Sequence, residues 1–180
     1  MSKSVLILSG SPRKFGNSDT LCDEFMKGAI ASGNTVEKIR VAEKKINYCT
    51  GCYHCAKNSG QCIFKDDMSE IIEKLIASDV IVLASPVYFY SISAQLKTLI
   101  DRTVSRWEEI QNKEFYFIAT AAENETEALE TTFACFKGFV DCCEGSVEKG
   151  RIEAKGVYEM GDVKNTNYLE IAFNMGKSIK

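Results

Sequence analysis

Four of the eight cysteines lie within fourteen residues, in the pattern C-x2-C-x2-C-x6-C. They are Cys49, Cys52, Cys55 and Cys62. Three thiolates two residues apart can bind three corners of an iron–sulfur cubane, and a fourth from further along completes the set. A structural zinc site usually pairs two ligand couples across roughly 12 to 20 residues, and this run has no such gap. The spacing favours a 4Fe–4S cluster over zinc, and a disulfide or free thiols stay open as alternatives.

The stretch SGSPRKFGNSDT, residues 9–20, is a second candidate for chemistry. It combines hydroxyls, a cation and an amide with the start of an expected helix: Ser9, Ser11, Ser18, Thr20, Arg13 and Asn17. Backbone N–H groups and the positive end of a helix suit a phosphate dianion, and hydroxyls donate to its oxygens. The stretch matches neither a Walker A motif nor a G-x-G-x-x-G fingerprint. It predicts a site for a single terminal phosphate, with a plain turn capped by Asn17 or Ser18 as the alternative.

Apolar periodicity predicts strands and helices that alternate along the chain. Strands are expected at 4–8, 35–41, 79–86, 114–120 and within 146–158, and helices at 18–31, 68–77, 92–104, 125–143 and 165–179. Alternation with right-handed crossovers gives a doubly wound α/β fold, and five strands favour a parallel sheet in the flavodoxin-like order 2-1-3-4-5. Loops at the carboxyl ends of these strands share one edge, where ligands bind. That edge would collect residues 9–18, 49–62, 85–90 and 119–123.

Composition excludes some classes of partner. A net charge of −3 and a pI near 5.4 argue against sequence-independent binding to nucleic acid, which needs clustered Lys and Arg. The apolar run Val5–Leu8 is too short for a signal peptide or a membrane span. We therefore expect a cytoplasmic protein with no nucleic-acid or membrane partner. We also expect one domain over residues 1–180, with a cysteine-rich loop at 47–66.

The expected location determines the redox state of the cysteines, because cytosolic thiols are kept reduced. Eight cysteines then point to metal binding, redox chemistry or burial rather than to a disulfide framework. Four of them fall on expected helices or a helix end, where cysteine acts as a small hydrophobe: Cys22, Cys135, Cys142 and Cys143. The sole histidine, His54, is expected to be a solvated loop residue.

Three motifs resemble one protein family. The pattern GSPRxxGN[ST] after the first strand resembles the FMN-phosphate loop of the NADPH-dependent FMN reductase family. The segment SPVYFYSISAQLKTLIDR, Ser85–Arg102, resembles that family's third strand and following helix. The run CxGCxxCxxxxxxCxxxDDM resembles the cysteine motif of the iron–sulfur flavoproteins, a branch of the same family. These motifs lie in the first hundred or so residues, and the remainder is similar only in the order of its elements.

The resemblance implies a flavodoxin-like three-layer fold that binds FMN. By that resemblance Pro86, Val87, Tyr88 and Phe89 contact the flavin, while Lys97, Asp101 and Arg102 support their loop. The third flavin loop of the family, after strand four, carries over as Thr120 and Ala121, although its usual glycine is missing from ATAAEN. An aromatic side chain and a close backbone suit a flat heteroaromatic ring.

The function expected from this resemblance is an FMN-binding oxidoreductase with NADH or NADPH as donor, passing electrons through the flavin and a 4Fe–4S cluster. No side chain is assigned as catalytic, because the flavin carries the chemistry. A redox partner protein and a homodimer or homotetramer, with flavin near a subunit contact, are also implied. Alternatives are a cluster-free NAD(P)H-dependent reductase of quinones, nitroaromatics or azo compounds, and a non-catalytic flavin electron carrier. A metal-binding regulatory module without flavin is a further alternative, and the SGSPRKFGNS loop argues against it.

Overall fold

The computed structural model describes residues 2–180 and contains a five-stranded sheet in the order β2-β1-β3-β4-β5. Every neighbouring pair is parallel, so the predicted flavodoxin-like arrangement is confirmed. The strands are β1 Ser4–Ser9, β2 Thr35–Arg40, β3 Val80–Pro86, β4 Glu114–Thr120 and β5 Val147–Ala154. Strand β2 lies on one side of β1, and β3 lies on the other side, so the order in which strands are added reverses there. The carboxyl ends of β1 and β3 are therefore neighbours at this switch point.

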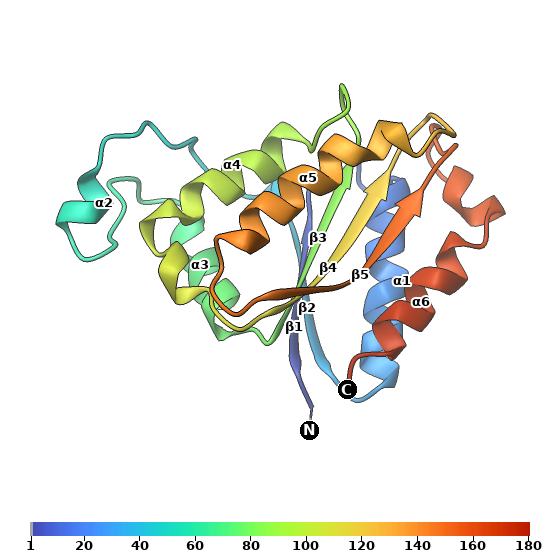
Figure 1. Ribbon diagram of the computed structural model, residues 1–180, viewed down its shortest axis with the longest axis horizontal. Coiled ribbons are helices and arrows are strands. Elements are labelled where there is room, and N and C mark those ends of the chain that lie inside the picture. Colours follow the sequence, from blue (N-terminus) through green and yellow to red (C-terminus); the bar gives the residue numbers. More distant parts are fainter. Residues whose placement is uncertain (1) are drawn as a thin grey trace.

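Helices cover both faces of the sheet (Figure 1). They are α1 Asn17–Ala31, α2 His54–Lys57, α3 Met68–Ala77, α4 Ala94–Arg102, α5 Glu127–Asp141 and α6 Tyr168–Lys177. Side chains of β1 alternate between the two faces, as the period of a strand requires. Val5 and Ile7 pack in a core with residues of α1 and α6, whereas Leu6 and Leu8 pack in a second core with residues of α3, α4 and α5. The fold therefore has three layers.

Element boundaries differ from the expected ones by a few residues at helix ends. Helix α4 begins two residues later than Ile92, because Ser93 accepts the Leu96 N–H and caps it. Before α6, residues Asp162–Asn165 form a 3-10 turn, and the Thr166 hydroxyl accepts the Tyr168 N–H at 3.2 Å. Short 3-10 segments also occur at Val41–Glu43, Thr103–Ser105 and Trp107–Glu109.

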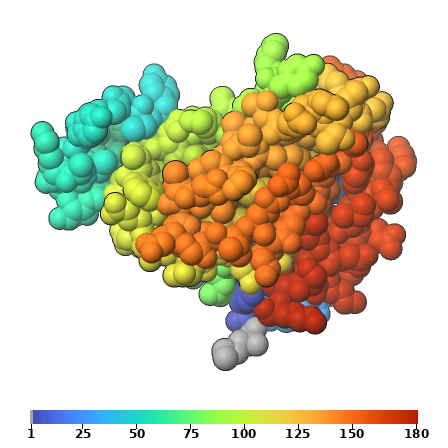
Figure 2. All heavy atoms as spheres, in the orientation of Figure 1, coloured from blue at the N-terminus to red at the C-terminus, as the bar shows by residue number. Residues whose placement is uncertain are grey.

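The cysteine-rich segment between β2 and α3 stands out from the body of the molecule. Figures 1 and 2 show it as a cyan projection beyond α3 and α4, with α2 as its one helical turn. The two ends of the segment meet at its base, where the Asp66 carboxylate accepts the Asn47 backbone N–H at 2.9 Å. Over residues 2–180, no helix has the length and apolarity needed to cross a membrane.

Candidate functional site

A cavity of about 350 Å³ opens at the carboxyl ends of β1, β3 and β4. It is lined by Ser11, Arg13, Gly16, Asn17, Ser18, Pro86, Val87, Tyr88, Phe89, Tyr90, Thr120, Ala122, Glu123, Val157 and Tyr158. Segments far apart in the sequence are thus brought to one place at the switch point of the sheet. Ser9, Thr20 and Ala121 are the predicted site residues that do not line this cavity.

The loop after β1 lines the cavity and is held by hydrogen bonds of its own. The Ser11 hydroxyl accepts the Arg13 N–H at 3.2 Å, and the Gly16 N–H donates to the Arg13 carbonyl at 3.1 Å. Helix α1 then begins at Asn17, and Gly16 before it has no side chain with which to cap the helix. Gly16, Asn17 and Ser18 all line the cavity, so the positive end of α1 lies at its wall, as an anion site requires.

A buried carboxylate, Asp19, fixes this loop from behind. Its side chain is 1% exposed and accepts hydrogen bonds from the Ser9 hydroxyl at 2.9 Å and from the Phe15 N–H at 3.1 Å. Lys38 and Arg40 of β2 form ion pairs with it at 3.2 and 3.3 Å. Burial alone would raise the pKa of Asp19, but the Phe15 and Ser9 bonds and the Lys38 charge outweigh it and lower that pKa. Asp19 is therefore ionised.

Asp19 also explains where two of the predicted residues lie. The Ser9 hydroxyl donates to the Asp19 carboxylate and is fully buried, so it faces away from the cavity. The Thr20 hydroxyl donates to the Phe15 carbonyl at 3.3 Å and holds the same loop. Asp19 was not identified from the sequence. The signal that could have found it is the position of a carboxylate in the first turn of α1, directly after a loop suited to bind an anion, where a second negative charge is unexpected.

Asn17 links the loop to the C-terminal part of the chain. Its amide donates to the Glu159 carbonyl at 2.9 Å and accepts the Gly161 and Val163 N–H groups at 3.2 and 3.3 Å. These bonds hold residues 157–163 against the loop, which is why Tyr158 reaches the cavity. The Tyr158 carbonyl also lies 3.4 Å from the Arg13 guanidinium. No motif in the sequence marks Val157 or Tyr158.

The loop after β3 forms a tight hairpin that displays aromatic side chains. Tyr88 and Ser91 exchange backbone hydrogen bonds of 2.9 and 3.1 Å, which leaves Phe89 and Tyr90 as the two central residues. Both have positive φ, 49° and 61°, where glycine or asparagine is usual. The hairpin rises from the surface in Figure 2 (light green), and Phe89 is fully exposed at its tip. Strain of this kind is characteristic of binding sites.

The loop after β4 closes the cavity from a third side. The Thr120 hydroxyl is buried and lies 3.4 Å from the Ser18 hydroxyl, and the Thr120 carbonyl accepts the Val87 N–H at 2.8 Å. Ala121 is buried. Its N–H donates to the Ala154 carbonyl, and its carbonyl accepts the Val157 N–H. It therefore supports this wall without lining the cavity.

All four clustered cysteines line a second cavity, of about 190 Å³, in the projecting segment. Its wall also contains Thr50, Gly51, Tyr53, Ile63, Phe64, Arg102 and Val104. Within residues 2–180, no three His, Cys, Asp or Glu side chains are arranged to hold a metal ion. A single ion draws its ligands closer together than a cubane does, because each thiolate of a cubane binds its own iron. Four cysteines around one cavity therefore fit a four-iron cluster better than a zinc ion.

Arg102 anchors the base of this segment. Its guanidinium is bidentate to the Asp66 carboxylate, at 2.8 and 3.0 Å, and also donates to the Asn47 carbonyl. Burial would raise the pKa of Asp66, but the bonds from Arg102 and Asn47 lower it to about 2. The resemblance implied that Arg102 supports the flavin loop, whereas the contacts here are to the two ends of the cysteine segment. Lys97 and Asp101 form an exposed ion pair at 2.5 Å.

The other cysteines agree in part with their predicted packing role. Cys22 and Cys143 are buried, and burial raises the pKa of both thiols, that of Cys143 to about 11. Cys135 is half-buried with its sulfur 3.7 Å from the Ser91 hydroxyl. Cys142 is exposed at the end of α5, so it does not pack as a hydrophobe there. All eight cysteines are free, and His54 is half-buried at the start of α2.

The chain is similar in sequence or in fold to several known proteins. An iron–sulfur flavoprotein of Methanocaldococcus jannaschii is 35% identical, and the match covers 97% of this chain and 94% of that relative. An iron–sulfur flavoprotein of Archaeoglobus fulgidus is 49% identical over 56% of this chain, but the match spans only 44% of that relative. A solved NAD(P)H:quinone oxidoreductase from Methanothermobacter marburgensis has a TM-score of 0.80 over 100% of both chains, at 17% identity, which is a likeness of fold.

The family model described as NADPH-dependent FMN reductase matches residues 4–143. This range contains the phosphate-type loop (residues 9–20), the strained hairpin (residues 88–91) and the cysteine segment (residues 47–66). Together with the nearly full-length match to the Methanocaldococcus relative, this range covers most of the site just described. The chain therefore belongs to the NADPH-dependent FMN reductase family.

Proposed function

We propose that the protein is an FMN-binding oxidoreductase that takes electrons from NADH or NADPH and passes them through the flavin to an acceptor. The observation that carries this proposal is the 350 Å³ cavity, where the phosphate-type loop, the strained hairpin and the loop after β4 converge. Membership of the FMN reductase family supports the same cofactor and the same class of reaction.

The residues around the cavity divide into two groups by chemistry. Ser11, Ser18, Arg13 and the first N–H groups of α1 would hold the phosphate, with Asp19 keeping their loop in place. Pro86, Val87, Tyr88, Phe89 and Thr120 would contact the ring system. FMN, when bound, supplies the hydride and electron chemistry. The protein's part is to anchor the phosphate, orient the ring and leave one side open to donor and acceptor.

The four cysteines of the projecting segment are proposed to hold a 4Fe–4S cluster. Their common cavity, largely lined by apolar groups apart from Arg102, supports this, as do the iron–sulfur flavoprotein names of the two relatives. A one-electron centre in the same protein as a two-electron cofactor would let the protein exchange single electrons with a redox partner protein.

Turnover tests the proposal against its alternatives. The FMN-loaded protein is mixed without oxygen with NADPH or NADH and a benzoquinone, and nucleotide oxidation is followed by absorbance. Steady turnover supports the reductase. Flavin that is reduced only by a chemical or protein donor, with no nucleotide oxidation, would identify an electron carrier instead.

Metal analysis separates the iron–sulfur protein from a cluster-free reductase. Iron and acid-labile sulfide are measured on protein purified without oxygen, with Cys52→Ser as the test variant and Cys142→Ser as the matched control. About four irons per chain in the parent and in Cys142→Ser, with loss in Cys52→Ser, is the expected pattern. Bound FMN without iron would favour the cluster-free reductase.

Association of copies is a further part of the proposal. Large apolar side chains are exposed beside the flavin cavity: Phe15, Tyr88, Phe89, Tyr90, Tyr158 and Met160. A homodimer or homotetramer would cover them and would place the flavin near a subunit contact. Light scattering should give a mass of two or four chains, and a monomer at micromolar concentration would contradict this.

A further inference from the structure

Among the described residues, Arg102 is the one charged side chain that lines the cysteine cavity. It is the last residue of α4 and is 2% exposed. A buried charge needs partners, because its removal from water is costly. The identity of those partners therefore indicates what the site around Arg102 is built to hold.

The hydrogen bonds of Arg102 leave part of the guanidinium unused. Nη1 donates to the Asn47 carbonyl and to Asp66, and Nη2 donates to Asp66 at 3.0 Å. The Phe64 ring lies 5.1 Å from the Arg102 Cζ. The buried Nε has no hydrogen-bond partner among the described residues. A buried guanidinium N–H without an acceptor is costly, so this N–H is available to an acceptor held in the cavity.

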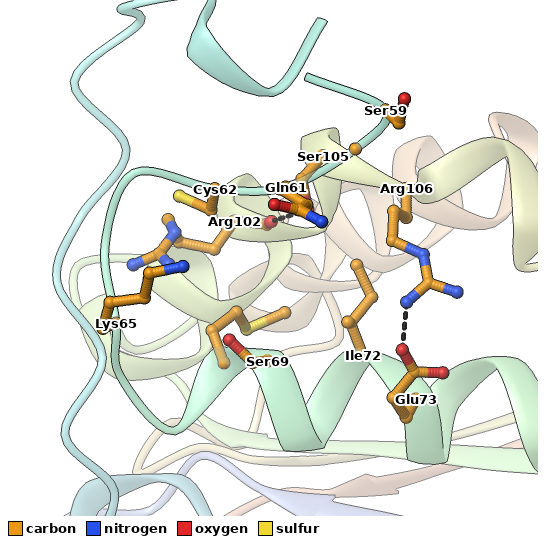
Figure 3. A pocket seen from close by; sticks show the side chains of 12 residues that line it. Ser59, Gln61, Cys62, Lys65, Ser69, Ile72, Glu73, Arg102, Ser105 and Arg106 are labelled. Carbon is orange, nitrogen blue, oxygen red and sulfur yellow. Dashed lines mark hydrogen bonds and ion pairs between the residues drawn. The ribbon is translucent and has the colours of Figure 1, made fainter.

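Cys62 is the cysteine that faces Arg102. Both residues line the cysteine cavity and also a neighbouring polar cavity of about 310 Å³, so the pair forms part of the wall between them. Figure 3 shows the two side chains together at one end of the polar cavity, away from the Arg106–Glu73 ion pair.

Four thiolate ligands would bring four negative charges into this cavity, because the thiolate is the form that binds metal. Hydrogen bonds to the sulfurs and the net charge nearby set the potential of an iron–sulfur centre. We propose that Arg102 is a positioning residue for the cluster: its Nε–H donates to the sulfur held at Cys62, and its charge offsets the thiolates. Its remaining N–H groups tie both ends of the ligand segment to α4. This inference rests on the proposed cluster.

The test measures the reduction potential of the cluster in protein purified without oxygen, alongside iron and acid-labile sulfide. The positive charge of Arg102 stabilises the reduced, more negative form of the cluster. Arg102→Gln removes this charge and should therefore lower the reduction potential. Asp66→Asn removes the anchoring carboxylate but keeps the guanidinium, so it should not lower the potential. Lys65→Gln removes a positive charge from an exposed side chain of the same segment and should change the potential little.

A parent protein without iron would overturn the cluster proposal and this inference with it. If Arg102→Gln holds iron and has the parent's reduction potential, the role of Arg102 is refuted while the cluster proposal stands. The same holds if Asp66→Asn lowers the reduction potential as much as Arg102→Gln does. If Arg102→Gln holds no iron, Arg102→Lys decides. Iron retained by Arg102→Lys or by Asp66→Asn supports the proposal, whereas loss in all three variants means that Arg102 only anchors the segment.

Discussion

The Asp19 carboxylate accepts the backbone N–H of Phe15 at 3.1 Å and so holds Phe15 at a φ of 60°, a left-handed conformation that a phenylalanine rarely adopts. Because Phe15 precedes the N-terminus of α1, this bond helps to set the shape of the proposed phosphate site. The bond joins a buried ion to a strained backbone, which makes Asp19 the residue on which the loop depends.

Asp19→Asn should therefore weaken FMN binding. Asparagine is neutral, so the charge-assisted bonds are lost and Lys38 and Arg40 are left beside an uncharged group. The loss of one such bond corresponds to a rise of about 10- to 100-fold in the FMN dissociation constant. Quenching of flavin fluorescence measures it. Asp23→Asn, which also removes a partner of Lys38 but touches no part of the loop, is the control; an equal effect there would contradict the role of Asp19.

Phe89→Gly should separate strain from binding. Glycine adopts a positive φ freely, so this variant should gain roughly 1 kcal/mol in free energy of unfolding while its affinity for FMN falls. Urea denaturation and FMN titration measure the two quantities. Ser59→Gly, at a φ of 50° in the cysteine segment, should relieve strain in the same way without a change in FMN affinity. A Phe89→Gly variant that binds FMN as the parent does would exclude Phe89 from the site.

The Asp66–Arg102 pair predicts loss of stability in acid. The pKa of Asp66 is about 2 in the folded protein, below its ordinary value of about 3.9 when unfolded. A lowered pKa stabilises the fold above pH 4, and this contribution, about 3 kcal/mol at most, disappears as the pH falls from about 4 to about 2. Urea denaturation at pH 6 and pH 2.5 should show a larger loss in the parent than in Asp66→Asn. Parallel losses would contradict the pairing.

Close packing of α1 on α6 predicts a position that admits only glycine. A Cβ on Gly28 would lie 2.0 Å from the Phe173 carbonyl oxygen, and one on Gly176 would lie 2.0 Å from the Phe25 carbonyl oxygen. Gly28→Ala should therefore lower the free energy of unfolding by about 1–3 kcal/mol, as overpacking does. Gly138→Ala, in α5 with open space around it, should instead gain roughly 0.5–1 kcal/mol. Thermal or urea denaturation compares them, and equal effects would refute the contact.

Much of the fold could be predicted because its three inner strands are continuous apolar runs and its helices have apolar faces. The strand Val80–Pro86 is buried over six of its seven residues, which is the burial of a central parallel strand. The phosphate-type loop was recognisable for a similar reason, since hydroxyls, an arginine and a helix start are adjacent in the chain. Local patterns of this kind need no knowledge of the tertiary structure.

The residues that sequence reasoning missed are those whose role depends on distant partners. Asp19 is fixed by Lys38 and Arg40 of β2, a pairing that follows only from the order of the strands. Tyr158 reaches the cavity because Asn17 binds a segment more than 140 residues away. Arg102 was assigned to the flavin loop by resemblance, whereas its partners Asn47 and Asp66 lie at the base of the cysteine segment.

The central claim is that residues 11–18 bind the phosphate of FMN, and paired titrations with FMN and riboflavin test it most directly. Flavin is removed from the protein, and each compound is added back while its fluorescence is followed. The two ligands share the ring and differ in the phosphate, so the ring contacts cancel in the comparison. We predict one FMN per chain and an affinity for riboflavin weaker by about 10- to 100-fold or more. Equal affinities, or no binding of FMN, would contradict the account.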